Sequence, residues 1–270
     1  MIRNPAVAGQ FYRGTKEALE KEVAPLVKKE AAKEDAIGVV SPHAGYLYSG
    51  AVAGATLSSI KPKKTYVIMG PNHTGMGEPF GLSAAQSWRT PLGEVKIDKA
   101  LAEAIKKNSG YIKYDDLSHA HEHSIEVQLP FLQHLQGNDF KFVPIVISQG
   151  LLEAYRDIGK EIALAVKELK AEKDVAIIAS SDMTHYESQK AAEKKDRAAI
   201  DAILALDEER LVDSISSLGI TMCGYAPAAI MIAAAKLLGA KKARLVKYMT
   251  SGNATGDYTS VVGYAGIIIS

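Results

Sequence analysis

The sequence predicts an α/β fold: one three-layer domain with a mostly parallel, mixed β-sheet and helices on both faces. Short apolar runs rich in β-branched residues alternate with longer amphipathic segments, which is typical of β-α-β units. The 270 residues and the 47% hydrophobic content suffice for one large core. Because the sequence contains no repeat, low-complexity segment or linker, we expect residues 1–270 to form a single domain.

Helices are expected where apolar residues recur every three or four positions among charged ones. Pro25 could kink or divide the helix expected over residues 17–30, and Pro130 is expected to kink the helix over 125–135 or end it early. Asp98 is a candidate N-cap for the helix over 97–107. The helix over 50–60 is rich in small residues and could sit close to the sheet. The expected helices cover residues 17–30, 50–60, 97–107, 125–135, 151–169, 190–206, a short stretch from 208, and 227–238.

Strands are expected where β-branched and aliphatic residues run together between turn signals. Pro144 has no backbone N–H and therefore indicates an edge strand or a bulge. The sequence Thr-Pro-Leu-Gly from Thr90 to Gly93 indicates a turn. The last two strands follow one another directly and could pair antiparallel. The expected strands cover residues 36–40, 65–69, 80–85, 140–147, 175–179, 243–249 and 258–269.

Charge and cysteine content narrow the class of protein. With 32 Lys and Arg against 31 Asp and Glu, the net charge is +1, so no nucleic-acid partner is expected. The single cysteine excludes an internal disulfide and favours a reducing compartment or a metal or redox role. Residues 1–10 do not resemble a signal peptide, and the longest apolar stretches fall short of the roughly 20 residues that span a bilayer. We therefore expect a soluble, cytoplasmic protein with no membrane association.

Two histidines follow the first two expected central strands. His43 lies in the sequence Ser-Pro-His-Ala-Gly-Tyr, and His73 ends the sequence Gly-Pro-Asn-His. Side chains just beyond the ends of parallel strands point into the crevice where doubly wound sheets bind ligands. Imidazole is also the commonest protein ligand of transition metals. A lone loop histidine more often caps a helix or binds a carbonyl group, but two similar strand–proline–histidine sequences in one chain favour a site.

Cys223 stands before the helix expected from Pro227. A helix N-terminus stabilises a thiolate and lowers its pKa. The sulfur could thus complete a three-ligand metal centre with His43 and His73 that keeps an open position. From spacing alone the alternative is the better interpretation, because free cysteines are often small buried hydrophobes.

A dense polar cluster precedes the fourth expected helix. On an extended segment His119, His121 and His123 would point to one side and could share a metal, but a solvated loop is favoured for the first two. Glu122, His123 and Glu126 are better site candidates, and the two glutamates share a face if the helix begins this early. Glu126 could equally be a surface carboxylate. The His-Glu-x-x-His motif of zinc peptidases is absent.

Asp182 and His185 follow the third buried strand. The pair could provide a general base, or it could form hydrogen bonds that orient a metal-binding side chain. The alternative is an N-cap at Ser181 or Asp182. Ser180 and Ser181 lie outside any Gly-x-Ser-x-Gly elbow, which disfavours a serine hydrolase. Neither a Gly-x-Gly-x-x-Gly motif nor a P-loop supports a nucleotide site.

Taken together, these segments resemble those of the Memo family, the mediator-of-cell-motility-like proteins. The matches run in order from one end of the chain to the other, which makes the resemblance far more specific than any single motif. The matching segments are RNPAVAGQFY (3–12), SPHAGYLY (41–48), MGPNH (69–73), RTPL (89–92), EHSIEVQLPF (122–131), SSDMTHY (180–186), CGYAP (223–227) and YTSVVGYAG (258–266).

The resemblance implies a fold like that of the LigB-type extradiol dioxygenases, which hold a non-haem iron with two histidines and a carboxylate. In Memo-like proteins a cysteine takes the third position. This implies His43, His73 and Cys223 as metal ligands, with His185 and His123 lining the pocket. A soft thiolate shifts the metal preference towards copper, zinc or thiolate-tolerant iron and weakens the case for ring cleavage. Prokaryotic relatives are often named component B of a three-part system, which implies a radical-SAM protein and a third small protein as partners.

Three functions are compatible with these residues. The first is a metal-dependent redox enzyme with copper or iron, in which His185 with Asp182 supplies acid/base chemistry and His123 orients substrate or oxygen. The second is a binding module for a small molecule or peptide, or a metal chaperone, that uses the same pocket. The third is zinc-assisted hydrolysis, in which the open position activates water. Symmetric homodimers are common among soluble proteins in general, so a homodimer is also compatible with this chain.

Overall fold

The computed structural model describes residues 1–28 and 32–270. The first helix, α1 (Lys16–Val23), ends shortly before Pro25, whose nitrogen has no hydrogen to continue the helical hydrogen bonds. The helix is therefore shorter than the expected 17–30, and residues 29 and 30 of that expectation lie outside the described residues.

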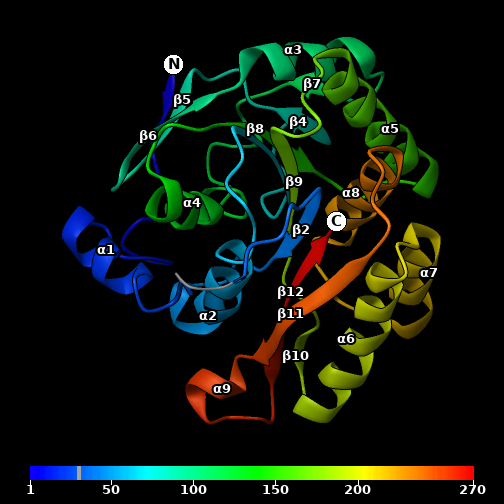
Figure 1. The fold of residues 1–270 in the computed structure, drawn as a ribbon. Helices are drawn as coiled ribbons and strands as arrows, with labels where there is room; N and C mark the ends of the chain where they lie inside the picture. The colour runs from blue at the N-terminus through cyan, green and yellow to red at the C-terminus, as the bar shows by residue number, and fades with distance from the viewer. Residues whose placement is uncertain (29–31) are drawn as a thin grey trace.

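Within the described residues, twelve strands join one mixed sheet, and the chain is a single α/β domain (Figure 1). The main path through the sheet is β1-β5-β6-β8-β3-β9-β2-β12-β10; β11 pairs with β12, and β4 and β7 attach beside β8. The predicted fold class is confirmed. The strands are β1 (Ile2–Arg3), β2 (Gly38–Ser41), β3 (Thr65–Pro71), β4 (Phe80–Leu82), β5 (Ser87–Thr90), β6 (Gly93–Ile97), β7 (Lys113–Tyr114), β8 (Lys141–Ile147), β9 (Val175–Ser180), β10 (His185–Glu187), β11 (Ala243–Thr250) and β12 (Val261–Ile269).

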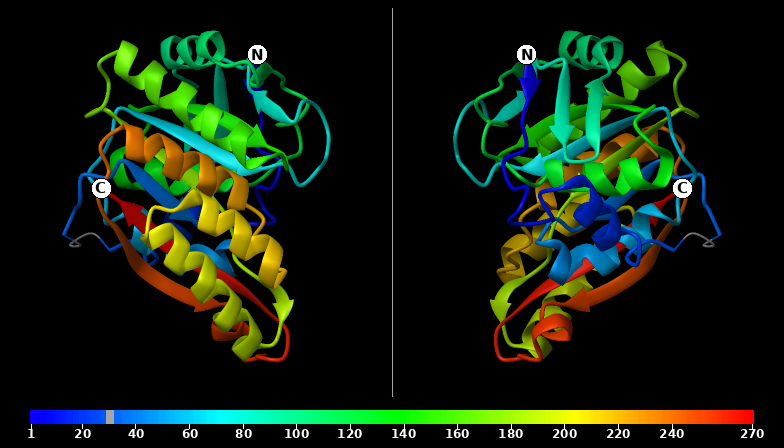
Figure 2. Two further views of the ribbon diagram at one scale, coloured as in Figure 1. Left: turned by 90° about the vertical axis from the view of Figure 1, so that its right-hand side faces the viewer. Right: turned by 90° about the vertical axis from the view of Figure 1, so that its left-hand side faces the viewer.

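Helices cover both faces of the sheet, as expected. One face carries α2, with α1 and α4 beside it, and the other carries α8 and α5 together with α6 and α7 (Figures 1 and 2). The second helix does approach the sheet closely, because a Cβ added to Gly266 would lie 1.8 Å from Thr56 Oγ1. Besides α1, the helices are α2 (Tyr46–Leu57), α3 (Lys99–Asn108), the 3₁₀ helix η1 (Glu126–Gln128), α4 (Leu129–Gln136), α5 (Leu152–Glu168), α6 (Gln189–Leu204), α7 (Glu208–Leu218), α8 (Tyr225–Leu237) and α9 (Gly252–Thr255).

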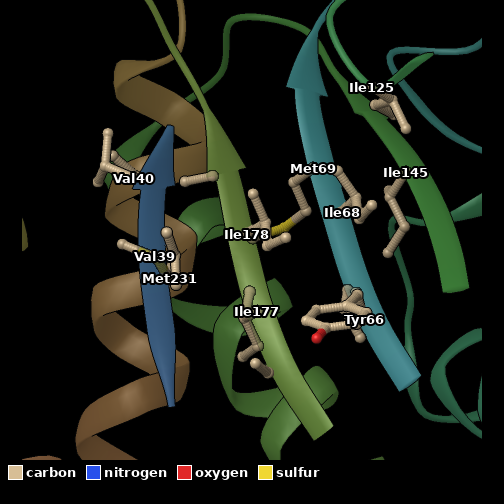
Figure 3. Close-up of a cluster of buried hydrophobic side chains, with 14 of the residues drawn as sticks. Val39, Val40, Tyr66, Ile68, Met69, Ile125, Ile145, Ile177, Ile178 and Met231 are labelled. Carbon is tan, nitrogen blue, oxygen red and sulfur yellow. The ribbon is translucent and has the colours of Figure 1, made fainter. Parts of the chain in front are cut away.

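Three parallel neighbours, β3, β9 and β2, form the centre of the sheet. All their residues are buried, because helices cover both faces. Figure 3 shows Val39, Ile178 and Met69 projecting from these three strands, with Met231 of α8 beside β2. This packing fixes the relative positions of the strands and, with them, the loops at their carboxyl ends.

Two of the three expectations based on proline are wrong, those for Pro144 and Pro130. Pro144 lies in β8, an interior strand that pairs along its whole length with β3. On its other side β8 pairs with β6 up to Phe142 and with β4 from Ile145, so the missing N–H falls between two successive partners. Pro130 neither kinks nor ends α4, because it occupies the first turn, where a backbone N–H has no helical acceptor.

The carboxyl-terminal strands make the sheet mixed. β11 and β12 pair antiparallel, as expected, and β12 also pairs antiparallel with β2. The short strand β10 pairs with the beginning of β12, and Figure 1 shows these strands and α9 extending together to one end of the molecule. Among the described residues, no helix is both long and apolar enough to cross a membrane.

Candidate metal centre

Three loops at one edge of the sheet carry the polar residues of the candidate site. His43, His73 and Asp182 each lie two residues beyond the end of their strand, β2, β3 and β9 respectively. These strands are parallel neighbours in the order β3-β9-β2, so their carboxyl ends meet at the same edge. This is the position where ligands bind to α/β sheets.

Cys223 reaches the same edge from the loop before α8. Its neighbour Gly224 lies so close to the end of β9 that an added Cβ would be 2.3 Å from the carbonyl oxygen of Ser180. Only glycine permits so close an approach of two backbones. As a result, Cys223 Sγ lies 3.3 Å from His43 Nε2 and 3.7 Å from the carbonyl oxygen of Asp182.

His43, His73 and Cys223 present donor atoms that all lie within 4.8 Å of one another. The two imidazole centroids are 5.2 Å apart, with the rings edge to face. Bonds of about 2.0 Å to nitrogen and 2.3 Å to sulfur place the ligands of one tetrahedral ion roughly 3–4 Å apart. The three side chains, which lie far apart in the sequence, therefore fit a single transition-metal ion.

The contacts of Ser180 determine which nitrogen of His43 is free. Ser180 Oγ lies 2.5 Å from the carbonyl oxygen of Ser124, which can only accept, so the hydroxyl hydrogen is donated there. The same oxygen accepts a hydrogen bond from Gln128 Nε2 at 2.8 Å. His43 Nδ1, 3.0 Å away, must then donate to Ser180. This leaves the lone pair of His43 Nε2 directed towards Cys223.

Glu122 determines which nitrogen of His73 is free. Its Oε1 lies 3.0 Å from His73 Nδ1 and its Oε2 accepts the backbone N–H of His73 at 2.7 Å. His123 Nδ1 lies 3.5 Å from the same Oε1, and its ring stacks on that of His73 at 4.7 Å. The carboxylate thus holds His73 Nδ1, so His73 Nε2 is left for a ligand, an arrangement common behind metal-bound histidines.

His185 and Asp182 complete the polar groups of the site. The backbone carbonyl of Thr221 lies 2.9 Å from His185 Nδ1 and can only accept a hydrogen bond, so Nε2 is the unprotonated nitrogen. Asp182 Oδ1 accepts the backbone N–H groups of His43 at 2.8 Å and Ala44 at 3.3 Å. It fixes the loop that carries His43, and it does not cap a helix, since α6 begins only at Gln189.

Burial dominates the electrostatics of the site. It lowers the pKa of His43 well below its ordinary value, which keeps this imidazole neutral. It would also lower the pKa of His73, but Glu122 outweighs burial and the net shift is upward. Burial raises the pKa of Asp182 to about 6. Burial and then Asp182 raise the pKa of the Cys223 thiol, so the expectation that the start of α8 lowers it is wrong.

The polar cluster before α4 is divided between different environments. His121 is exposed, as expected. His119 is buried against Trp88 with Nε2 2.9 Å from the carbonyl oxygen of Gly81, so the expected solvated loop is wrong for this residue. Glu126 is buried too and pairs with Arg3, so it is neither a surface carboxylate nor part of the His–His–Cys cluster.

The sequence does not indicate the residues that lie behind the site. Ser180 and Gln128 orient His43 through hydrogen bonds, and the ring of Phe11 packs on that of His123 at 4.6 Å. All three contacts join segments far apart in the chain, and no local pattern marks them.

The fold and these side chains define an α/β protein with a His–His–Cys cluster at the carboxyl ends of parallel strands. The model of a family described as Memo-like protein matches residues 3–268, and the chain belongs to that family.

The curated relatives match over almost their whole length. A MEMO1 family protein from Methanococcoides burtonii is 46% identical, with 99% of this chain and 100% of the relative covered. Another, from Methanopyrus kandleri, is 43% identical with 99% of both chains covered. Among solved structures, an uncharacterized protein from Escherichia coli K12 has a TM-score of 0.55 at 13% identity, covering 86% of this chain and 98% of that one. This last likeness shows the fold alone.

Proposed function

We propose that the protein is a metal-dependent redox enzyme that holds copper or iron with His43, His73 and Cys223. The main support is the orientation of the two imidazoles, since each donates from Nδ1 to a fixed partner and keeps the Nε2 lone pair for a ligand. Neutral imidazole and thiolate are donors that copper and thiolate-tolerant iron accept, and zinc is compatible with the same set. Cationic charge between the donors would also favour loss of the Cys223 proton.

The surrounding residues can transfer protons and orient a substrate. A bound copper or iron ion supplies one-electron chemistry at the open position. His185 lines the cavity, and because its Nδ1 is bound to Thr221, its Nε2 can accept a proton as a base and return it as an acid. His123, whose ring stacks on that of His73, lines the same cavity and orients the substrate. Asp182 acts as a positioning residue through the His43 loop.

Metal analysis of anaerobically purified protein tests this proposal. We expect about one copper or iron ion per chain, with an electron paramagnetic resonance signal that shows nitrogen and sulfur ligation. The double variant His43→Ala, Cys223→Ala should lose it. His121→Ala serves as the control, because this exposed histidine lies outside the cluster. Equal copper and iron affinity in the double variant and the parent would contradict the proposal.

The variant His185→Ala separates an enzyme from a binding module or metal chaperone. Since His185 is not among the three ligands, metal content should stay unchanged. Oxygen uptake by the copper-loaded protein, with ascorbate as electron donor, should fall by about a hundredfold or more if His185 transfers protons. If neither parent nor variant consumes oxygen while both retain the metal, the binding-module alternative is favoured.

A further inference from the structure

A cavity of about 510 Å³ opens beside the candidate metal ligands and is lined by the four histidines of the site. Its further lining includes four aromatic side chains from separate parts of the chain: Phe11, Tyr48, Tyr186 and Tyr264. The faces of such rings attract other rings and organic cations. The aromatic lining therefore indicates the kind of ligand that the cavity binds, which the metal ligands alone do not.

Tyr186 is held at this cavity by a strained backbone. Its φ is +59°, in the left-handed region that a bulky residue rarely adopts. It lies at the irregularity between His185 and Glu187 where β10 pairs with β12, and its side chain is 78% exposed. The irregularity explains this conformation, because a bulge re-aims the side chain of its extra residue. It turns the exposed ring of Tyr186 towards the cavity that this residue lines.

Tyr264 offers an unused polar group to the same space. The residue lies in β12 and is only 2% exposed, yet its hydroxyl makes no hydrogen bond to any described residue. It is also not among the fully enclosed polar atoms without partners, so the hydroxyl opens into the cavity that the residue lines. A buried phenol normally finds a hydrogen-bond partner, and here the partner must come from a ligand or water.

The acidic groups of the lining are carboxylates from two different loops, Asp182 and Asp257. Asp257 Oδ1 accepts hydrogen bonds from the backbone N–H and the hydroxyl of Thr259, at 2.8 and 2.6 Å. These bonds hold the pKa of Asp257 below its ordinary value, so the group is ionised at neutral pH. The other oxygen, Oδ2, has no partner among the described residues and can accept a hydrogen bond from a ligand.

We propose that the cavity binds a small aromatic amine in its protonated form. The ring packs between Phe11 and Tyr186, the ammonium group pairs with Asp257, and a polar ring substituent reaches the hydroxyl of Tyr264. This assignment rests on the proposed function, because it names the substrate class of the same site. It also explains why the aromatic side chains and the carboxylate line the same cavity as the histidines.

Three probes of equal ring size but different charge test the assignment by calorimetry. They are tyramine (cationic), 4-ethylphenol (neutral) and 4-hydroxyphenylacetate (anionic), each titrated into the full-length protein in metal-free and copper-loaded form at neutral pH. Tyramine should bind more tightly than 4-ethylphenol by roughly two- to fivefold, as one cation–π or ion-pair contact at a partly exposed site provides. The anion should bind most weakly to the metal-free protein.

Single substitutions assign the preference to residues. Asp257→Asn keeps the bonds to Thr259 and should abolish the difference between tyramine and 4-ethylphenol. Tyr186→Leu should weaken both probes, whereas Tyr186→Phe, which keeps the ring, should not. Asp213→Asn, an exposed carboxylate on α7, is the matched control and should change nothing. Thermal unfolding of each variant checks that it is folded.

Several outcomes would overturn the assignment. They are tighter binding of the anion by the metal-free protein, no detectable binding of tyramine at millimolar concentration, or an unchanged preference in Asp257→Asn. The metal-free titrations separate this inference from the proposed function. If the preference for the cation appears but no metal binds, the redox proposal fails and the ligand class stands. If metal binds but the preference is absent, the ligand class fails and the redox proposal stands.

Discussion

Ser180 shows how one side chain can determine the state of a histidine. Its hydroxyl donates to Ser124 and accepts from Gln128, and the remaining lone pair takes the hydrogen on His43 Nδ1. With every hydrogen-bonding group of Ser180 used, the other tautomer of His43 would leave two acceptors facing each other. The neutral imidazole is thus held in the form that can bind a cation through Nε2.

His119 provides a prediction at the same scale. Burial lowers its pKa to about 4, against 6.5 for an exposed histidine. The unfolded chain therefore binds a proton between pH 6.5 and about 4 that the folded chain does not, so stability falls as the pH falls through this window. The loss should approach about 3 kcal/mol and level off below pH 4.

The variant His119→Gln isolates this effect, because glutamine can keep the hydrogen bond to the Gly81 carbonyl without titrating. The measurement is the free energy of unfolding in urea at several pH values, for parent and variant. The difference in the free energy of unfolding between parent and variant should change between pH 6.5 and 4. Other buried groups, such as His43 and His123, are present in both proteins, so their contributions cancel in this difference. Parallel curves would show that His119 contributes nothing to acid sensitivity.

At the scale of elements, η1 connects the N-terminal segment to the site. Its first residue, Glu126, pairs with Arg3 and accepts hydrogen bonds from the backbone N–H groups of Ala6 and Val7, at 2.7 and 3.1 Å. The hydroxyl of Tyr12 also donates to it, at 2.6 Å. The segment fixed in this way carries Phe11, which packs on His123 and lines the cavity.

The variant Glu126→Ala tests this connection. It leaves a buried guanidinium and three other donors without their acceptor, so we expect a loss of about 3–5 kcal/mol in the free energy of unfolding. The measurement is chemical denaturation, with Glu94→Ala as control, since its pair with Arg89 is exposed and should matter little. A loss no greater than that of the control would contradict this role of Glu126.

The elements themselves could largely be predicted, because their hydrophobic periodicity is local. Asp98 does cap α3, accepting the backbone N–H of Leu101 at 3.2 Å. Pro144 could not be interpreted in the same way. The rule that places proline at an edge assumes one continuous partner on each side, and β8 changes its partner from β6 to β4 at that residue. Such a change depends on the whole sheet.

At the scale of the whole molecule, the positions of His43, His73 and Asp182 follow from the parallel arrangement of their strands, and the sequence suffices to expect them at one edge. Cys223 is different. The sequence offers it as a possible third ligand, but its spacing alone favours a buried hydrophobe, and the resemblance to a family is what makes the ligand the better interpretation. Its place depends on the contact of Gly224 with Ser180, which brings together residues more than forty positions apart. Contacts of this kind have no local signature.

The wide separation of His43, His73 and Cys223 along the chain bears on the order of assembly. His43 and His73 follow β2 and β3, which lie on either side of β9 in the sheet, and Cys223 comes after β9 in the chain. The three donors therefore meet only after β9 has paired with both strands. Capture of an ion would then come after the long-range strand pairings, which are the slow steps of such topologies. A cation that binds the folded chain more tightly than the unfolded chain would then raise the free energy of unfolding of the completed sheet by mass action.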